Sequence, residues 1–139
     1  MAALSRIPQR LSFVTLGTRD MPRARAFYAS WGWPERDGGS DEFAQFDMGG
    51  VRLALYPLDL LGAEAAPGCA APAPGWNGVT LAINVGSQIL VDEAYHAAVA
   101  SGARSIAEPI AREWGGYSAY VADPEEQRWE IAWLPGLDL

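Results

Sequence analysis

A single glutamate in the last strand-like segment is the residue best placed to do chemistry. The segment RWEIAW, residues 128–133, alternates two sets of side chains: Trp129, Ile131 and Trp133 with Arg128, Glu130 and Ala132. Successive side chains of a β-strand point to opposite faces, so burial of the tryptophans turns Glu130 the other way. We expect Glu130 to face either solvent or a pocket.

Few conventional catalytic partners accompany this glutamate. His96 is the only histidine, and it falls within a helical segment where we expect an exposed position. Cys69 is the only cysteine, which excludes an internal disulfide and a cysteine-based zinc cluster. A nucleophile activated by an imidazole base is therefore not expected. No segment resembles a phosphate-binding glycine loop.

Three roles remain open for Glu130. It could pair with Arg128, Arg52 or another cation on a wet surface, where such pairs contribute little to stability. It could act as a general acid or base in a reaction without metal. It could also anchor a cationic or hydrogen-bond-donating group of a ligand.

Composition narrows the class of partner. The chain has 139 residues, half of them hydrophobic, which suits one globular domain with its own core. Its net charge of −7 disfavours a nucleic-acid partner and favours a neutral or cationic small molecule. The sequence has neither a signal-peptide pattern nor an apolar run of membrane-spanning length. We expect a cytoplasmic protein with no membrane partner.

Two parts of the chain share one plan, which indicates an internal repeat. Residues 13–18 and 80–85 alternate in the manner of half-buried strands, and helical segments follow at 20–31 and 87–101.

Both helical segments carry start and stop signals. Asp20 and Ser87 are suitable N-caps, with Pro22 in the first turn of the earlier helix. Gly32 and Gly102 follow the two helices, where a left-handed residue is expected.

Three short strands are predicted after each helix. They are residues 33–36, 43–47 and 51–56 in the first half, and 105–112, 116–121 and 128–133 in the second. Residues 57–76 are rich in Ala, Pro and Gly and are predicted to form a flexible or extended linker. The chain is thus one domain with three parts: a module at about 10–57, the linker at about 57–76, and a module at about 77–135.

The sequence resembles the vicinal oxygen chelate superfamily of glyoxalases, bleomycin-resistance proteins and extradiol dioxygenases. The resemblance lies in FVTLGTRDMPRARAFYASWGW at 13–33, VTLAINV at 79–85 and GGYSAYVADPEEQRWEIAW at 115–133. It implies an α+β fold in which two βαβββ modules form a curved, cup-shaped mixed sheet. It also implies a homodimer, but the activities of such folds vary too widely to name one.

Metal-dependent members of this superfamily carry ligands at four positions, two histidines and two carboxylates. Aligned on this sequence, these positions hold Phe13, Ala54, Thr80 and Glu130, of which only Glu130 is a competent ligand. A catalytic divalent metal needs about three protein ligands. We therefore expect neither a metal nor another cofactor.

The leading hypothesis is a metal-independent, glyoxalase-like protein that binds a small molecule in the cup. The ligand could be an aromatic or basic antibiotic that the protein sequesters, because aromatic side chains and one carboxylate line the expected cup. The expected lining is Phe13, Thr15, Tyr56, Thr80, Trp114, Tyr117 and Glu130. The alternative is a lyase, isomerase or hydrolase that acts on a small carbonyl compound with Glu130 as general acid or base.

Overall fold

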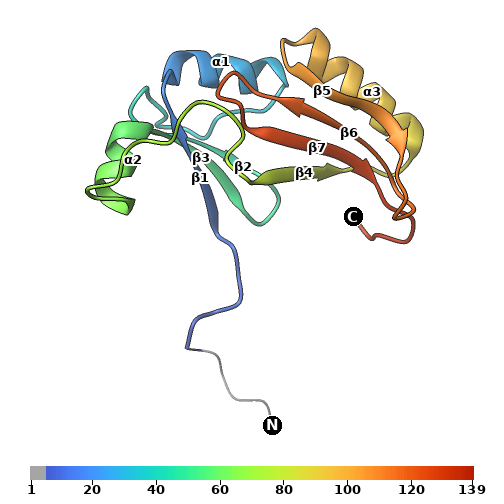
Figure 1. Cartoon of the computed structure of the whole chain (residues 1–139), viewed down its shortest axis with the longest axis horizontal. Helices are drawn as coiled ribbons and strands as arrows, with labels where there is room; N and C mark the ends of the chain where they lie inside the picture. The colour runs from blue at the N-terminus through green and yellow to red at the C-terminus, as the bar shows by residue number, and fades with distance from the viewer. Residues whose placement is uncertain (1–5) are drawn as a thin grey trace.

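The computed structural model describes residues 6–139, which form two sheets and three helices (Figure 1). In chain order the elements are β1 (Phe13–Thr18), α1 (Met21–Ser30), β2 (Ala44–Asp47), β3 (Arg52–Pro57), α2 (Leu58–Ala65), β4 (Thr80–Asn84), α3 (Gln88–Ala100), β5 (Arg104–Ala111), β6 (Tyr117–Ala122) and β7 (Arg128–Trp133). The three-stranded sheet has the order β1-β3-β2, and the four-stranded sheet has the order β4-β7-β6-β5.

The two sheets are built in the same way. The first strand of each pairs in parallel with the last, β1 with β3 and β4 with β7, and the other pairs are antiparallel. Helices α1 and α3 lie on one side of the sheets (Figure 1). We call the opposite side, toward which Glu130 points, the open face. This arrangement confirms the predicted α+β fold of two βαβββ-like modules.

The helix ends follow the predicted signals. The Asp20 carboxylate accepts a hydrogen bond from the Arg23 N–H at 3.1 Å, and Ser87 Oγ accepts one from the Leu90 N–H at 3.2 Å. Gly32 and Gly102 follow the two helices with φ of 81° and 104°, which is left-handed backbone that favours glycine. Local sequence thus sets both helix boundaries. No helix within residues 6–139 is long and apolar enough to cross a membrane.

Residues 33–36 do not form the predicted strand. Pro34 has no N–H to donate to a ladder, and the segment makes a single backbone bond to β2, from Arg36 N to Gln45 O at 2.8 Å. The side chain of Trp33 instead stacks on the Tyr28 ring, with centroids 5.5 Å apart. The first sheet consequently has one strand fewer than the second.

The predicted linker contains a helix, so the prediction that all of it is flexible or extended was wrong. Helix α2 packs against β1 and β3. A Cβ added to Gly17 would lie 2.5 Å from Leu58 Cδ1, so glycine at this position allows the helix to approach. Since residues 13, 15 and 17 share one side of β1, α2 covers part of the open face of the first sheet.

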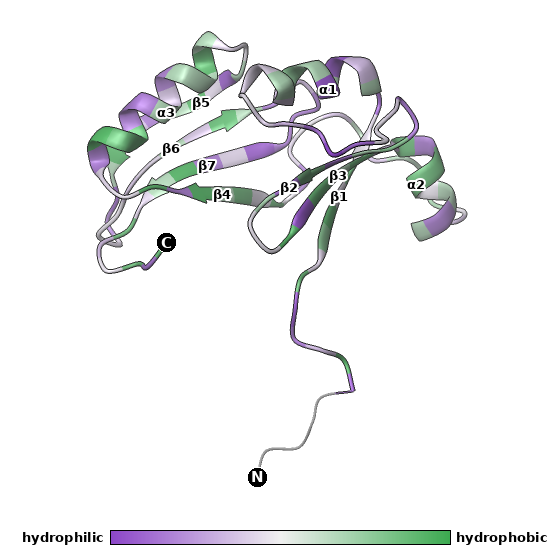
Figure 2. Ribbon diagram, turned by 180° about the vertical axis from the view of Figure 1, so that it is seen from behind, coloured by the Kyte–Doolittle hydropathy of each residue, from purple (hydrophilic) through white to green (hydrophobic). Residues whose placement is uncertain are grey.

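One core joins the two modules on the side of α1 and α3. Tyr28 is fully buried, and its hydroxyl donates to Asp123 Oδ2 at 2.5 Å. The same hydroxyl accepts from Trp129 Nε1 at 3.0 Å. A side chain of α1 is therefore bonded to β7 and to the turn that precedes it. Figure 2 shows hydrophobic residues along β1, β3 and β4, where the two sheets meet.

Burial raises the pKa of Asp123, and the Tyr28 hydroxyl and the backbone N–H groups of Gln127 and Glu125 oppose that rise. Burial also raises the pKa of Tyr28, to which the charge of Asp123 adds. The tyrosine hydroxyl thus stays protonated and donates to a buried carboxyl group. Such groups are costly to leave without a partner.

We expect Tyr28→Phe to lower the free energy of unfolding by about 2–3 kcal/mol, because it removes one bond to a carboxylate and one from an indole. Tyr95→Phe is the matched control. Tyr95 is also buried, but its hydroxyl shares one bond with Ser105 Oγ at 2.6 Å, so its loss should cost about 1 kcal/mol. Denaturant titration measures both, and equal losses would contradict the role given to Tyr28.

Candidate functional site

Glu130 lies on the open face, as strand alternation predicts. Its neighbour Trp129 is buried against Tyr28 on the other side of β7. The Glu130 side chain is half-buried, and its Oε2 accepts a hydrogen bond from the Tyr120 hydroxyl at 2.8 Å. Tyr120 stands directly opposite Glu130 in the ladder between β6 and β7. Glu130 is therefore held in place by a neighbouring strand.

The ion pairs considered for Glu130 are not those that form. Arg128 Nη1 lies 2.8 Å from Glu126 Oε2, and Arg52 Nε lies 3.4 Å from Asp47 Oδ1. Among the described residues, no cationic group lies within 4.0 Å of the Glu130 carboxylate. Glu130 is therefore a carboxylate with capacity to accept further hydrogen bonds.

Arg112, the residue after β5, adds a positive charge beside Tyr120 and Glu130. Its guanidinium lies over the Tyr120 ring, 5.4 Å from the centroid. Its Nε donates to Ser118 Oγ at 2.8 Å, and its Nη2 donates to the Ser118 carbonyl at 3.2 Å. We call Arg112, Ser118, Tyr120 and Glu130 the open-face cluster.

The Tyr120 hydroxyl is kept in its neutral, donating form. Burial raises the pKa of Tyr120 most, and the hydrogen bond to Glu130 and the charge of that carboxylate raise it further. The positive charge of Arg112 acts in the opposite direction. The cluster therefore presents a carboxylate, a phenol and a guanidinium side by side.

Trp114 lies next to the cluster, in the hairpin that joins β5 to β6. A Cβ added to Gly116 would lie 1.8 Å from the Trp114 ring, so the indole occupies the space that a side chain at 116 would fill. Residue 116 is two and four positions before Ser118 and Tyr120, and alternation gives all three the same face. Trp114 as a whole residue is 55% exposed. Trp114 thus adds an accessible flat surface to the open face.

The four positions that hold metal ligands in metal-dependent relatives do not fit a metal ion here. Phe13 is 45% exposed, Ala54 is fully buried and Thr80 is exposed, and Glu130 is the one carboxylate among them. Within residues 6–139, no three His, Cys, Asp or Glu side chains gather in a group that could hold a metal. The donor set thus falls short of the three or so ligands of a catalytic metal site.

Three of the other predicted ligand residues face different surroundings. Tyr117 was expected on the open face, but its hydroxyl donates to Asp92 of α3 at 2.6 Å, so that prediction was wrong. The Tyr56 hydroxyl donates to Glu64 of α2 at 3.2 Å, because the linker helix covers that part of the first sheet. Thr15 lines a small polar cavity together with Asp123 and Gln127.

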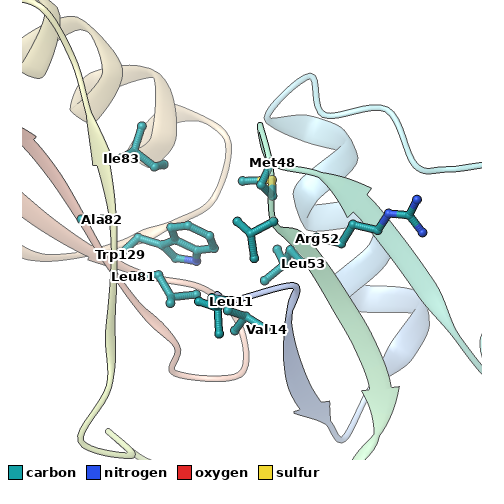
Figure 3. Close-up of a pocket in the computed structure, with 10 residues that line it drawn as sticks. Leu11, Val14, Met48, Arg52, Leu53, Leu81, Ala82, Ile83 and Trp129 are labelled. Atoms are coloured by element: carbon teal, nitrogen blue, oxygen red, sulfur yellow. The ribbon is translucent and has the colours of Figure 1, made fainter. Parts of the chain in front are cut away.

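An apolar cavity of about 200 Å³ lies between the two modules (Figure 3). None of the predicted ligand residues lines it. Its walls come from both modules: Leu11, Val14, Met48, Val51, Arg52, Leu53, Leu81, Ala82, Ile83 and Trp129. Ala82 at its edge is the partner of Glu130 in the ladder between β4 and β7. Val14, Leu53, Leu81, Ile83 and Trp129 point to the helix side, however, so most of the cavity lies behind the edge strand β4 as seen from the open-face cluster.

Sequence reasoning missed Tyr120 and Arg112. The signal for Tyr120 was available, because a strand at 116–121 places residues 118 and 120 on the face opposite Tyr117. Choosing between the two tyrosines required the register with β7. Arg112 carried no signal, because two register shifts in β5 break the simple alternation before residue 112.

The comparisons agree with this geometry. The glyoxalase-like domain family matches residues 13–132, which is most of the chain. The chain therefore belongs to that family, within the vicinal oxygen chelate superfamily. No match was found among curated proteins.

Solved structures show the same fold. A glyoxalase-related enzyme from Fulvimarina pelagi is 29% identical, with a TM-score of 0.81 over 92% of this chain and 90% of that one. A glyoxalase/bleomycin resistance protein/dioxygenase from Nocardioides is 26% identical, with a TM-score of 0.80 over 98% and 89%. A lactoylglutathione lyase from Agrobacterium tumefaciens, at 20% identity and a TM-score of 0.72 over 95% and 100%, shows the fold alone.

We expect Gly116→Ala to move the Trp114 ring, because the new methyl group cannot share its space with the indole. The measurement is the indole N–H signal of Trp114 in a ¹H–¹⁵N spectrum, assigned with Trp114→Phe. Gly86→Ala is the control, since its Cβ would meet nothing nearer than Leu90 Cδ1 at 3.9 Å. An unchanged Trp114 signal in Gly116→Ala would show that the ring does not lie on Gly116.

Proposed function

We propose that this protein is a metal-independent binder of a small organic molecule, which it sequesters at the open-face cluster and the neighbouring apolar cavity. The ligand class is an aromatic compound with a basic group, as in many antibiotics. The observation that carries the proposal is Glu130, a half-buried carboxylate that Tyr120 holds on the open face and that has no cationic partner among residues 6–139.

The size and lining of the cavity support an aromatic group. Cavities of about 150 Å³ lined by Leu, Ile and Phe accept a single aromatic ring. The cavity between the modules is larger, about 200 Å³, and Leu53, Leu81 and Trp129 are among its walls. The Arg52 guanidinium points away from it (Figure 3). An aromatic ring would be buried there by the hydrophobic effect.

The carboxylate supports the basic group. Ala82, which lines the cavity, is the ladder partner of Glu130, so a ligand with its ring in the cavity would have to extend around the edge strand β4 to bring an amine to the Glu130 carboxylate on the open face. Charge-assisted hydrogen bonds of this kind are stronger than neutral ones. The net charge of −7 adds a long-range attraction for a cation.

Metal-independent binding is supported by the donor set. Where metal-dependent relatives supply four ligands, this chain supplies one carboxylate, and that group already accepts a bond from Tyr120.

An enzyme that uses Glu130 as general acid or base is the second candidate. The favouring observation is the pair formed by Glu130 and Tyr120, a proton acceptor and a neutral phenol 2.8 Å apart. Such a pair could take a proton from carbon beside a carbonyl and donate to the carbonyl oxygen. The reaction would be a lyase, isomerase or hydrolase step on a small carbonyl compound.

We expect Glu130→Gln to weaken binding of benzylamine, a minimal aromatic amine, by about tenfold or more, because the charge that pairs with the ammonium is lost. Isothermal titration measures the affinity. Glu108→Gln, at an exposed position of β5, is the matched control and should bind as the unaltered protein does. Equal affinity in all three proteins would contradict the binding role. Loss of turnover of a carbonyl substrate in Glu130→Gln, with its binding intact, would favour the enzyme.

We also propose that two copies associate as a homodimer. Leu11 and Val79, which lie two and one positions before β1 and β4, are large apolar residues that are 65% and 49% exposed. Burial of such side chains between two copies is favourable.

We expect light scattering to give a mass of twice 14.9 kDa. Leu11→Asp combined with Val79→Asp should weaken the association about tenfold or more, because each change places a charge in an apolar contact. Ile89→Asp is the control, at a residue of α3 that is 69% exposed on the helix side. A mass of 14.9 kDa for the unaltered chain at micromolar concentration would refute the dimer.

A further inference from the structure

The arginines of this chain differ in whether they have a carboxylate partner, and this difference concerns the site. All ten basic residues are arginines. Six of them lie within 4.0 Å of a carboxylate: Arg19, Arg25, Arg36, Arg52, Arg104 and Arg128. Of the remaining four, Arg6, Arg10 and Arg23 are exposed and Arg112 is half-buried. Among residues 6–139, Arg112 is thus the one partly buried arginine without an acidic partner.

The Arg112 side chain is held in a defined position despite lacking a carboxylate. Its Nε and Nη2 donate to the side chain and backbone of Ser118, which is fully buried. Its planar group lies over the Tyr120 ring. These contacts occupy part of the guanidinium, and no acceptor within residues 6–139 lies in hydrogen-bond range of Nη1. A guanidinium with N–H groups left over is suited to a planar oxyanion.

The surroundings of Arg112 also offer a flat apolar surface. The ring of Trp114, two residues further along the chain, is folded onto Gly116, and the residue is 55% exposed. The charge of a half-buried guanidinium is costly without a counter-ion. The chain has 17 acidic residues and a net charge of −7, so Arg112 does not lack an acidic partner because acidic residues are scarce.

We propose that Arg112 is an anion anchor of the binding site and that the ligand carries a planar carboxylate, with its adjoining flat group against Trp114. This inference rests on the proposed binding function and extends it: the ligand is amphoteric, with a basic group at Glu130 and an acidic group at Arg112. Tyr120 lies between the two charged anchors, donates to Glu130 and supports the guanidinium with its ring.

The test compares benzoate with benzamide, which has nearly the same shape without the charge, by isothermal titration. The unaltered protein should bind benzoate at least about tenfold more tightly, because a charged hydrogen-bonding pair replaces a neutral one. Arg112→Gln should abolish this preference. Arg104→Gln, which removes an arginine paired with Glu126 at the start of β5, the strand that ends just before Arg112, should keep it.

Equal affinities for benzoate and benzamide in the unaltered protein would overturn the inference without any variant, so the test does not depend on the folding of Arg112→Gln. A benzoate preference that survives in Arg112→Gln would overturn it as well. Arg112→Lys should retain part of the preference, since the charge remains while the planar fork is lost. If benzylamine binds in a Glu130-dependent way and benzoate does not bind, the proposed function is supported and the role of Arg112 as an anion anchor is refuted. If neither probe binds, the proposed function and the anion anchor are both refuted.

Discussion

The alternation of side chains along β7 divides the protein into a structural side and a binding side. Trp129 points toward the helices, where its indole N–H bonds to Tyr28 and, through that hydroxyl, to the buried carboxyl of Asp123. Glu130 points to the open face. Because a strand cannot shift by one residue without exchanging its faces, the network that holds Trp129 also holds Glu130 in place.

The buried network also explains how two separate sheets act as one scaffold. Within the described part of the chain no strand ladder joins the two sheets, so other contacts must align them. Tyr28 comes from α1 in the first module, and its partners come from the second. The apolar cavity lies at the same junction, with Trp129 in its wall. Core packing and the shape of the candidate site therefore depend on one another.

The open face differs in chemistry between the modules. In the first sheet α2 covers Gly17 and engages Tyr56, and Arg52 pairs with Asp47. Among residues 6–139 no helix takes this position on the second sheet, and the charged ends of Glu130 and Arg112 keep hydrogen-bonding capacity. Two modules of similar plan have thus become a covered half and an accessible half, and the accessible half is the one suited to a ligand.

Much of the fold could be predicted because its signals are local. Hydrophobic alternation, the caps at Asp20 and Ser87 and the glycines at 32 and 102 depend on neighbouring residues, and the structure confirms them. The position of Glu130 followed from strand parity alone. The strand at 33–36 and the extended linker were mistaken, since the first lacks a donor at Pro34 and the second gains a helix by packing on β1 and β3.

The sequence by itself determined most of the helices and strands and the face on which Glu130 lies, because these follow from short-range periodicity, and the resemblance of its motifs indicated the family. Only the tertiary structure decided what surrounds that glutamate. Cross-strand register placed Tyr120 rather than Tyr117 beside it, and the irregular β5 carried Arg112 onto the same face. Contacts between strands distant in the chain depend on register and bulges, which a pattern along one strand does not encode.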